Sequence, residues 1–216
     1  MKRIFLAAGL LALVVTVAGC GPSSTPSPTG GTGNKSVVIQ PEDRSLGNPN
    51  APIQFVEYAA PSCPHCARFN AEVFPYLKRN YIDKGKVFYV FRVFPLGPQD
   101  IAAESLARCM PKENYFPFID LLFRKQEVWD PEFQVTDVQG GLVQVANSAG
   151  MTEAKAKSCI ADTKGVANRV NKNAEEAVEK YSLNSTPTFV INGTVKVGGF
   201  DQDSLKNFLD PLLSKK

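Results

Sequence analysis

A Cys-Pro-His-Cys tetrapeptide at residues 63–66 stands between a predicted strand and a predicted helix. Residues 53–58 follow the period-two alternation of a strand. After the tetrapeptide, apolar residues recur at every fourth position up to residue 81, which predicts one face of a helix. Residues 87–94 are nearly all β-branched or aromatic, so they predict a strand that is buried on both faces and central in a sheet. The chain is therefore built around a strand–helix–strand unit whose helix begins with two cysteines.

The rest of the pattern adds strands on both sides of this unit and a helical block after it. A short strand is predicted at 37–39, and Pro75 is expected to kink the helix that follows the cysteines. From residue 98 to about 180 the periodicity is helical, with helices predicted around 101–106, 115–122, 152–159 and 166–181.

The C-terminal part returns to strands. Residues 188–191 and 194–197 predict a hairpin with Asn192-Gly193 as its turn, and acidic residues open a closing helix at 201–213. The sequence therefore predicts an α/β fold, with one sheet of the α+β kind interrupted by a helical insertion.

The tetrapeptide carries the strongest chemical signal. Cys63 is expected at the helix N-terminus, where free N–H groups and the helix dipole stabilise a thiolate. Pro64 suits the first helical position, and a protonated His65 would add positive charge within the same turn. Both effects lower the pKa of Cys63 and make the disulfide a better oxidant. Cys66 lies one turn further in and suits the role of resolving thiol.

Three other uses of a Cys-x-x-Cys pair compete with a redox role: half of a zinc site, a structural disulfide, and haem attachment. Haem attachment fails because Ala67, not histidine, follows Cys66. Zinc needs two further ligands, and the sequence has no second Cys-x-x-Cys or histidine pair. A redox pair is the favoured interpretation, and no metal or cofactor is expected.

Composition sets the remaining boundaries. The chain has 216 residues, a formal net charge of +3, one histidine and five cysteines. This charge balance does not favour nucleic-acid binding, and one histidine excludes His-rich metal sites. Because five is odd, at least one cysteine must do something other than pair within the chain.

The N-terminus accounts for that cysteine. Lys2 and Arg3 precede an apolar stretch from Ile4 to Ala18 that is too short to span a typical bilayer, which is typical of a secretory signal. The ending Val-Ala-Gly-Cys at 17–20 is similar to a bacterial lipobox, so residues 1–19 are predicted to be a lipoprotein signal peptide and Cys20 to be lipidated. Ordinary cleavage that leaves a free Cys20, and an uncleaved anchor, are the alternatives. Residues 20–35 are rich in Gly, Pro, Ser and Thr and predict a flexible, lipid-anchored linker.

With these motifs in place, the chain resembles the DsbA-like thiol–disulfide oxidoreductases of the thioredoxin superfamily. The resemblance covers roughly residues 36–216 and implies a thioredoxin-like domain at 36–97 and 181–216 with a helical insertion domain at 98–180. It implies that Pro187 is a cis-proline beside the active disulfide, and that Thr186 pairs through its backbone with the substrate. It also implies that Glu57 is the buried acid that assists proton transfer at Cys66. A trans Pro187 and a solvent-facing Glu57 are the alternatives.

Two cysteines remain, in the helical block. In an exported chain Cys109 and Cys159 are predicted to form a structural disulfide, with a second redox pair as the alternative. The aromatic cluster of Tyr115, Phe116, Phe118 and Phe123 is interpreted as core instead of a substrate groove. A solvated basic face is predicted for Lys78, Arg79, Lys84 and Lys86.

These observations predict a monomeric lipoprotein on the periplasmic side of the cell envelope that donates disulfides to reduced or unfolded exported proteins. The resemblance implies reoxidation by a DsbB-type membrane quinone reductase. Thr186 departs from the valine of DsbA itself and looks more like the disulfide isomerases, so isomerase or reductase action is one alternative. A non-catalytic lipid-anchored chaperone or binding module is the other.

Overall fold

A computed structural model describes residues 36–214, in which five strands form one mixed sheet. The strands lie in the order β1-β3-β2-β4-β5, with β2 and β3 parallel and the other neighbours antiparallel. The strands are β1 (Arg44–Leu46), β2 (Ile53–Ala59), β3 (Val87–Val93), β4 (Thr188–Ile191) and β5 (Thr194–Val197). The predicted buried strand at 87–94 is therefore internal, although β2 and not β3 is the middle strand.

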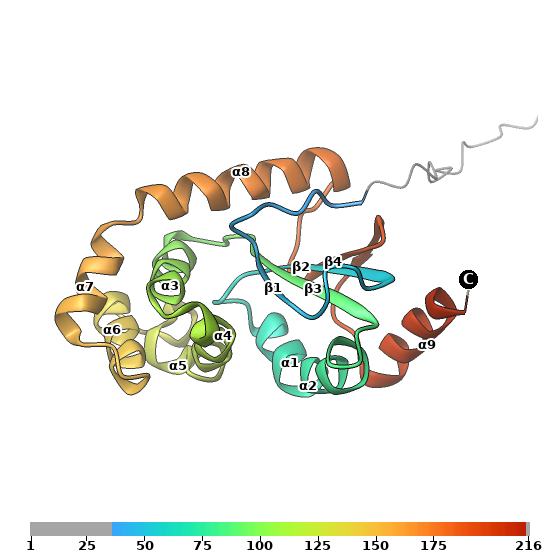
Figure 1. The fold of residues 1–216 in the computed structure, drawn as a ribbon. Helices are drawn as coiled ribbons and strands as arrows, with labels where there is room; N and C mark the ends of the chain where they lie inside the picture. Colours follow the sequence, from blue (N-terminus) through green and yellow to red (C-terminus); the bar gives the residue numbers. More distant parts are fainter. Residues whose placement is uncertain (1–35, 215–216) are drawn as a thin grey trace, which may run out of the picture. The chain divides into compact units, whose positions relative to one another are not determined.

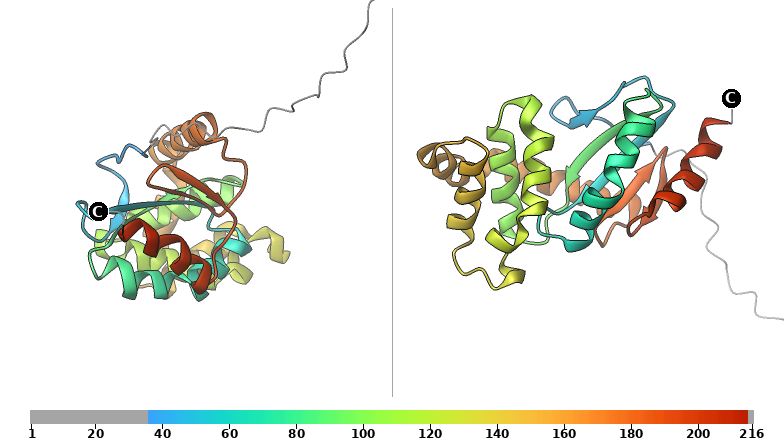
Figure 2. Two further views of the ribbon diagram at one scale, coloured as in Figure 1. Left: turned by 90° about the vertical axis from the view of Figure 1, so that its right-hand side faces the viewer. Right: turned by 90° about the horizontal axis from the view of Figure 1, so that it is seen from below.

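Helices cover both faces of this sheet (Figures 1 and 2). One face packs against α1 (Pro64–Glu72), α2 (Phe74–Leu77) and α9 (Gln202–Leu213), and the opposite face against α8 (Lys164–Tyr181). Between β3 and α8 the chain forms the helical block. Its α-helices are α3 (Pro98–Cys109), α4 (Tyr115–Arg124), α5 (Gln126–Trp129), α6 (Val138–Ser148) and α7 (Glu153–Ala161).

Strand alternation decides which side chains lie beneath α1. Phe55 belongs to the core beneath α1, α2 and α9, whereas Val56 and Tyr58 belong to the core beneath α8. Since side chains alternate along a strand, Glu57 lies on the same face as Phe55. The tetrapeptide after β2 and the acid within β2 are thus on the same side of the sheet.

The predicted strand at 37–39 is wrong, because its backbone groups are satisfied by side chains. The Gln54 side chain accepts from the Val37 N–H (3.0 Å) and donates to the Val37 carbonyl (3.1 Å). The Val38 carbonyl accepts from Arg92 at 2.7 Å. Strand β1, which follows this segment, forms one edge of the sheet.

Pro75 has a different effect from the expected kink. Helix α1 ends at Glu72, and a new helix, α2, begins at Phe74 with Pro75 in its first turn, where a missing N–H is tolerated. A π-helical turn at Lys78–Ile82 completes the segment. The apolar face predicted from Phe69 to Tyr81 is buried as expected.

Candidate functional site

Cys63 and Cys66 lie at the start of α1, both as free thiols. Cys63 is the N-cap residue, and its sulfur accepts a hydrogen bond from the Cys66 backbone N–H at 3.3 Å. Cys63 is 3% exposed and Cys66 is fully buried, whereas Pro64 and His65 are exposed. The nucleophile therefore reaches the surface at a helix N-terminus, and the second thiol lies behind it.

The fold brings the Thr186-Pro187 pair to Cys63 across 123 residues of sequence. The Thr186-Pro187 peptide bond is cis, which confirms that prediction, and Pro187 is buried just before β4. The Cys63 thiol donates a hydrogen bond to the Thr186 carbonyl at 3.5 Å. Cys63 therefore lies directly against the cis-proline segment.

These contacts favour a thiolate at Cys63 and lower its pKa to about 6. The largest cause is the hydrogen bond from the Cys66 thiol; burial acts in the opposite direction, and the Thr186 side chain and the backbone N–H groups of His65 and Cys66 add to the lowering. His65 contributes through its backbone N–H, and the effect of its imidazole charge stays a prediction. A thiolate with this pKa is populated at neutral pH.

We expect thiolate absorbance near 240 nm in the reduced protein to titrate with a midpoint near pH 6, about two to three units below an ordinary cysteine. Cys66→Ala removes the strongest hydrogen bond to the thiolate, so its midpoint should lie at higher pH. Cys63→Ala serves as the control and should show no step in this range. A wild-type midpoint near pH 8.5 would contradict the assignment.

Glu57 lies beneath the two thiols and is 2% exposed, which excludes the solvent-facing alternative. Burial raises the pKa of Glu57, a hydrogen bond from Tyr89 opposes this rise, and the charge of Cys63 adds to it, so that the pKa lies at about 8. The Tyr89 hydroxyl donates to Glu57 Oε2 at 2.6 Å. Burial also raises the pKa of Cys66 far above its ordinary value. The Glu57 carboxyl group, which can hold a proton near neutral pH, therefore lies close to Cys66, a thiol that resists ionisation.

Asp100, in the first turn of α3, is a site residue that the sequence analysis missed. It is fully buried, and its carboxylate accepts from the Ser62 N–H (2.9 Å) and the Ser62 hydroxyl (3.1 Å). It also accepts from the N–H groups of Leu96 (2.9 Å) and Gly97 (3.2 Å). Asp100 thus ties the residue before Cys63 to the start of the helical block. An acidic residue in a helix first turn was visible in the sequence, but its long-range partner was not.

The predicted disulfide between Cys109 and Cys159 is confirmed, with Cα atoms 6.3 Å apart. It joins the end of α3 to α7, within the helical block. Tyr115, Phe118 and Phe123 are buried and Phe116 is half-buried, as expected for core. Three members of the predicted basic face, Arg79, Lys84 and Lys86, are exposed, and Lys78 is partly so.

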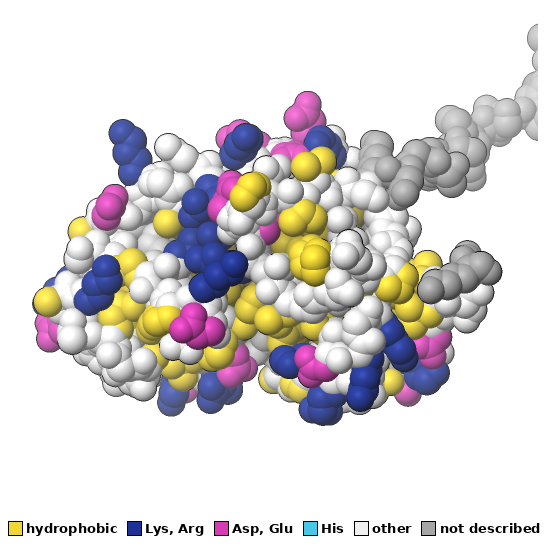
Figure 3. All heavy atoms as spheres, viewed as in Figure 1, with side chains coloured by type: hydrophobic (Ala, Val, Ile, Leu, Met, Phe, Trp, Pro, Cys, Tyr) yellow, Lys and Arg dark blue, Asp and Glu magenta, His cyan; other side chains and the backbone are white. Residues whose placement is uncertain are grey.

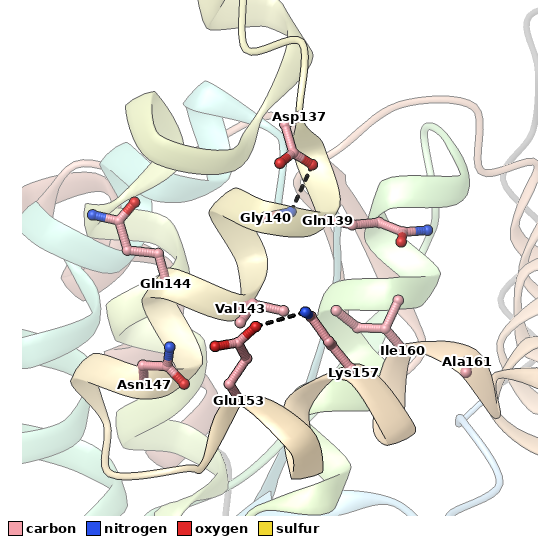
Figure 4. A pocket seen from close by; sticks show the side chains of 10 residues that line it. All are labelled: Asp137, Gln139, Gly140, Val143, Gln144, Asn147, Glu153, Lys157, Ile160 and Ala161. Carbon is pink, nitrogen blue, oxygen red and sulfur yellow. Dashed lines mark hydrogen bonds and ion pairs between the residues drawn. The ribbon is translucent and has the colours of Figure 1, made fainter.

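Other features lie apart from the thiols. A cavity of about 740 Å³ lies between α6 and α7; its lining contains the Glu153–Lys157 ion pair but no candidate site residue (Figure 4). Within residues 36–214, no cluster of His, Cys, Asp and Glu is suited to a metal ion, and no helix has the length and apolarity needed to cross a bilayer. Cys20, the predicted signal peptide and the predicted linker lie outside the described residues.

The chain is similar to known proteins both in sequence and in fold. The family model described as "Thioredoxin" matches residues 40–211. A protein of Rickettsia bellii named as a protein-disulfide oxidoreductase is 32% identical over 82% of this chain and 67% of its own length. For a similarly named Rickettsia felis protein the chain spans 63% of the relative's length. The Bacillus subtilis "Disulfide bond formation protein D" is 26% identical, covering 85% of this chain and 84% of that protein.

Solved structures agree with these relatives. The crystal structure of Wolbachia pipientis alpha-DsbA1 matches with a TM-score of 0.74 and 30% identity, covering 83% of this chain and 94% of that one. The expected thioredoxin-like fold is therefore confirmed.

Proposed function

This chain belongs to the DsbA-like thiol–disulfide oxidoreductases of the thioredoxin superfamily, and we propose that it donates the Cys63–Cys66 disulfide to reduced exported proteins. The contrast between the two thiols supports this direction most strongly. Contacts lower the pKa of Cys63 to about 6, whereas burial raises that of Cys66. A reduced form stabilised as the Cys63 thiolate makes the disulfide a strong oxidant.

The reaction consists of two exchanges that conserve atoms and electrons. A substrate thiolate attacks Cys63 Sγ, the Cys63–Cys66 bond breaks, and Cys66 leaves with the electron pair and takes up a proton. A second substrate thiolate then attacks the substrate sulfur of the mixed disulfide and releases Cys63 as a thiolate. The substrate loses two electrons, and the cysteine pair of the enzyme gains them.

Glu57 is proposed to supply the proton that Cys66 takes up. Its raised pKa keeps it protonated up to about pH 8. Tyr89 is proposed to set the upper limit of this range, because its hydrogen bond lowers the pKa of Glu57. Among the described residues, Tyr89 makes no hydrogen bond to Cys63 or Cys66. It therefore acts through Glu57, as a positioning residue.

Glu57→Gln is expected to slow formation of the mixed disulfide by about a hundredfold, in the range that a general acid contributes. The ratio of wild-type to Glu57→Gln rates cancels the titration of the substrate thiol. This ratio should be constant at low pH and fall as Glu57 ionises. Because the Cys63 charge that adds to the pKa of about 8 in the dithiol form is absent from the disulfide, the fall is expected at or somewhat below pH 8. In Tyr89→Phe the fall should move to higher pH, because the pKa-lowering hydrogen bond is lost. A ratio near one at every pH would contradict the role of Glu57.

Thr186 is proposed to hold the substrate beside Cys63 by backbone hydrogen bonds, as an added strand. Its carbonyl already lies within reach of the Cys63 sulfur. Because a threonine at this position also resembles the isomerases, isomerase or reductase action remains the second candidate function.

The deciding assay uses a peptide with two cysteines and scrambled ribonuclease as parallel substrates. The oxidised protein should oxidise the reduced peptide stoichiometrically and restore little ribonuclease activity. Faster recovery of scrambled ribonuclease than oxidation of the peptide would favour an isomerase. Binding of the peptide without any exchange would favour a chaperone or binding module.

We further propose that the domain acts at the periplasmic side of the envelope, as a monomer anchored through lipidated Cys20 and reoxidised by a DsbB-type quinone reductase. The helical insertion at 98–180 is proposed as a separate domain within the thioredoxin-like fold. The lipobox-like ending at 17–20 supports the anchor. Incorporation of labelled fatty acid in the wild type but not in Cys20→Ala tests it.

A further inference from the structure

An apolar groove of about 710 Å³ lies between β1, α2 and the start of α4. Its volume falls in the range of small-molecule sites, and its lining contains none of the candidate redox residues. The apolar lining consists of Leu46, Phe74, Pro75, Phe116 and Pro117. These side chains offer a surface for an extended hydrocarbon.

Arg44 lines the same groove. Its guanidinium lies over the Tyr115 ring at 5.3 Å from the ring centroid, and Tyr115 packs edge-on against Phe116 of the groove. The Arg44 Nε is buried, and no acceptor for it exists among the described residues. Arg44 as a whole is only partly buried and has no ion-pair partner among the described residues, so its charge at this end of the groove favours an anionic ligand.

Positive charge is concentrated around Arg44. The Arg108 guanidinium lies 5.8 Å from the same Tyr115 ring centroid, and Arg169 has a buried Nε that lacks an acceptor within the described chain. Burial first, and then the charge of Arg108, lower the pKa of Arg169. Figure 3 shows Lys and Arg side chains gathered on this face between α3 and α8.

Three carboxylates accompany these three arginines, and the two buried ones are already in use. Asp43 pairs with Arg92 at 2.7 Å. Glu104 accepts from Arg108 Nε with one oxygen and from the Tyr115 hydroxyl with the other, at 2.7 Å. Glu42 is the second acid near Arg169, and it is exposed. The Arg44 guanidinium therefore keeps its hydrogen-bonding capacity for a ligand.

Two of the other charges along the groove are matched by ion pairs: Lys78 pairs with Asp83 at 2.7 Å, and Asp120 pairs with Arg124 at 2.8 Å. The remaining two, Lys112 and Glu113, are exposed and opposite in sign, so they add no net charge to the lining. The groove thus combines an apolar wall with one unpaired positive charge, that of Arg44, at one end.

We propose that this groove binds a long-chain carboxylate, with the carboxylate on Arg44 and the alkyl chain over Leu46, Phe74 and Phe116. The two oxygens of a carboxylate match the planar guanidinium fork. An uncharged hydrocarbon would fill the groove but leave the Arg44 charge without a partner. The site is separate from the Cys63–Cys66 chemistry and does not rest on it.

Calorimetric titration of the full chain with laurate, below its micelle concentration, tests the site. We expect saturable one-to-one binding, with dodecanol, which has the same chain and no charge, binding at least about tenfold more weakly. Arg44→Gln should weaken laurate binding by at least about tenfold, and Arg44→Lys, which keeps the charge but loses the planar fork, should bind with an affinity between those of the wild type and Arg44→Gln. Arg79→Gln is the matched control, since Arg79 is an exposed arginine that does not line the groove, and should bind as the wild type does.

Several results would overturn the site: no saturable binding of laurate, equal binding of dodecanol, or undiminished binding by Arg44→Gln. Thermal melting of each variant without ligand verifies that it is folded. If Arg44→Gln fails to fold, Phe116→Asp decides the question, because it places a negative charge on the half-buried wall of the groove. Laurate affinity equal to that of the wild type in Phe116→Asp would equally overturn the proposal.

Discussion

Cys63→Ser is expected to reduce disulfide transfer to a reduced peptide by at least about a thousandfold, down to background exchange. Cys63 is the thiol that lies at the helix N-terminus, against the Thr186 carbonyl. Its pKa is lowered to about 6, so it is the better leaving group when the mixed disulfide is resolved. A serine hydroxyl has a similar shape but forms no disulfide. Stopped-flow fluorescence of the peptide measures the loss.

Cys66→Ala supplies the matched comparison. It keeps Cys63 but removes the thiol that resolves a mixed disulfide, so it is tested in the reverse direction with a peptide whose two cysteines are already oxidised. The Cys63 thiolate attacks the peptide disulfide, one peptide sulfur leaves as a thiolate, and the mixed disulfide should accumulate and be visible on non-reducing gels. Cys63→Ser should accumulate none. If Cys63→Ser kept substantial transfer, or if trapping occurred through Cys66 instead, the assigned order of the two thiols would be wrong.

The largest effect on stability is expected from Cys109→Ala/Cys159→Ala. The bond joins residues 50 apart, and in the chain-entropy model such a cross-link contributes about 4 kcal/mol to the free energy of unfolding. For a domain of this size the thermal midpoint should fall by about 10 °C. Calorimetry or circular dichroism melting of the oxidised proteins gives the difference.

The control for this variant is Cys63→Ala/Cys66→Ala. The disulfide between these two residues closes a loop of only about four residues, and in the same model it contributes about 2 kcal/mol, half as much. Transfer to the peptide, measured well below both midpoints, should be the same in Cys109→Ala/Cys159→Ala as in the wild type. A clear loss of transfer with little loss of stability would favour the second redox pair over a structural bond.

Local sequence signals predicted most of the fold around the thiols. The alternation at 53–58, the four-residue spacing after Cys66 and the β-branched run at 87–94 correspond to β2, to the α1–α2 segment and to β3. The failures have local causes. Residues 37–39 have strand-like side chains, but Gln54 and Arg92 occupy their backbone groups. Helices α5 and α6 were missed: α5 has only four residues, and α6 contains two adjacent glycines.

The site was predictable where its chemistry is local and hidden where it depends on register. Cys63 and Cys66 are three residues apart, so their placement follows from one helix start. Tyr89 reaches Glu57 only because β2 and β3 are parallel with Phe55 opposite Tyr89. Asp100 reaches Ser62 through the packing of α3. A hydroxyl within a fully buried strand was the available hint for Tyr89, since a buried tyrosine hydroxyl needs a partner.

The reduction potential of the Cys63–Cys66 pair tests the proposed direction of transfer most directly. Equilibration of the full chain with glutathione buffers, followed by alkylation of the free thiols and mass spectrometry, gives its value. Disulfide donation predicts a potential in the oxidising range of this superfamily, about −120 to −180 mV. A value near about −270 mV, typical of thioredoxin, would contradict it and make the protein a reductase.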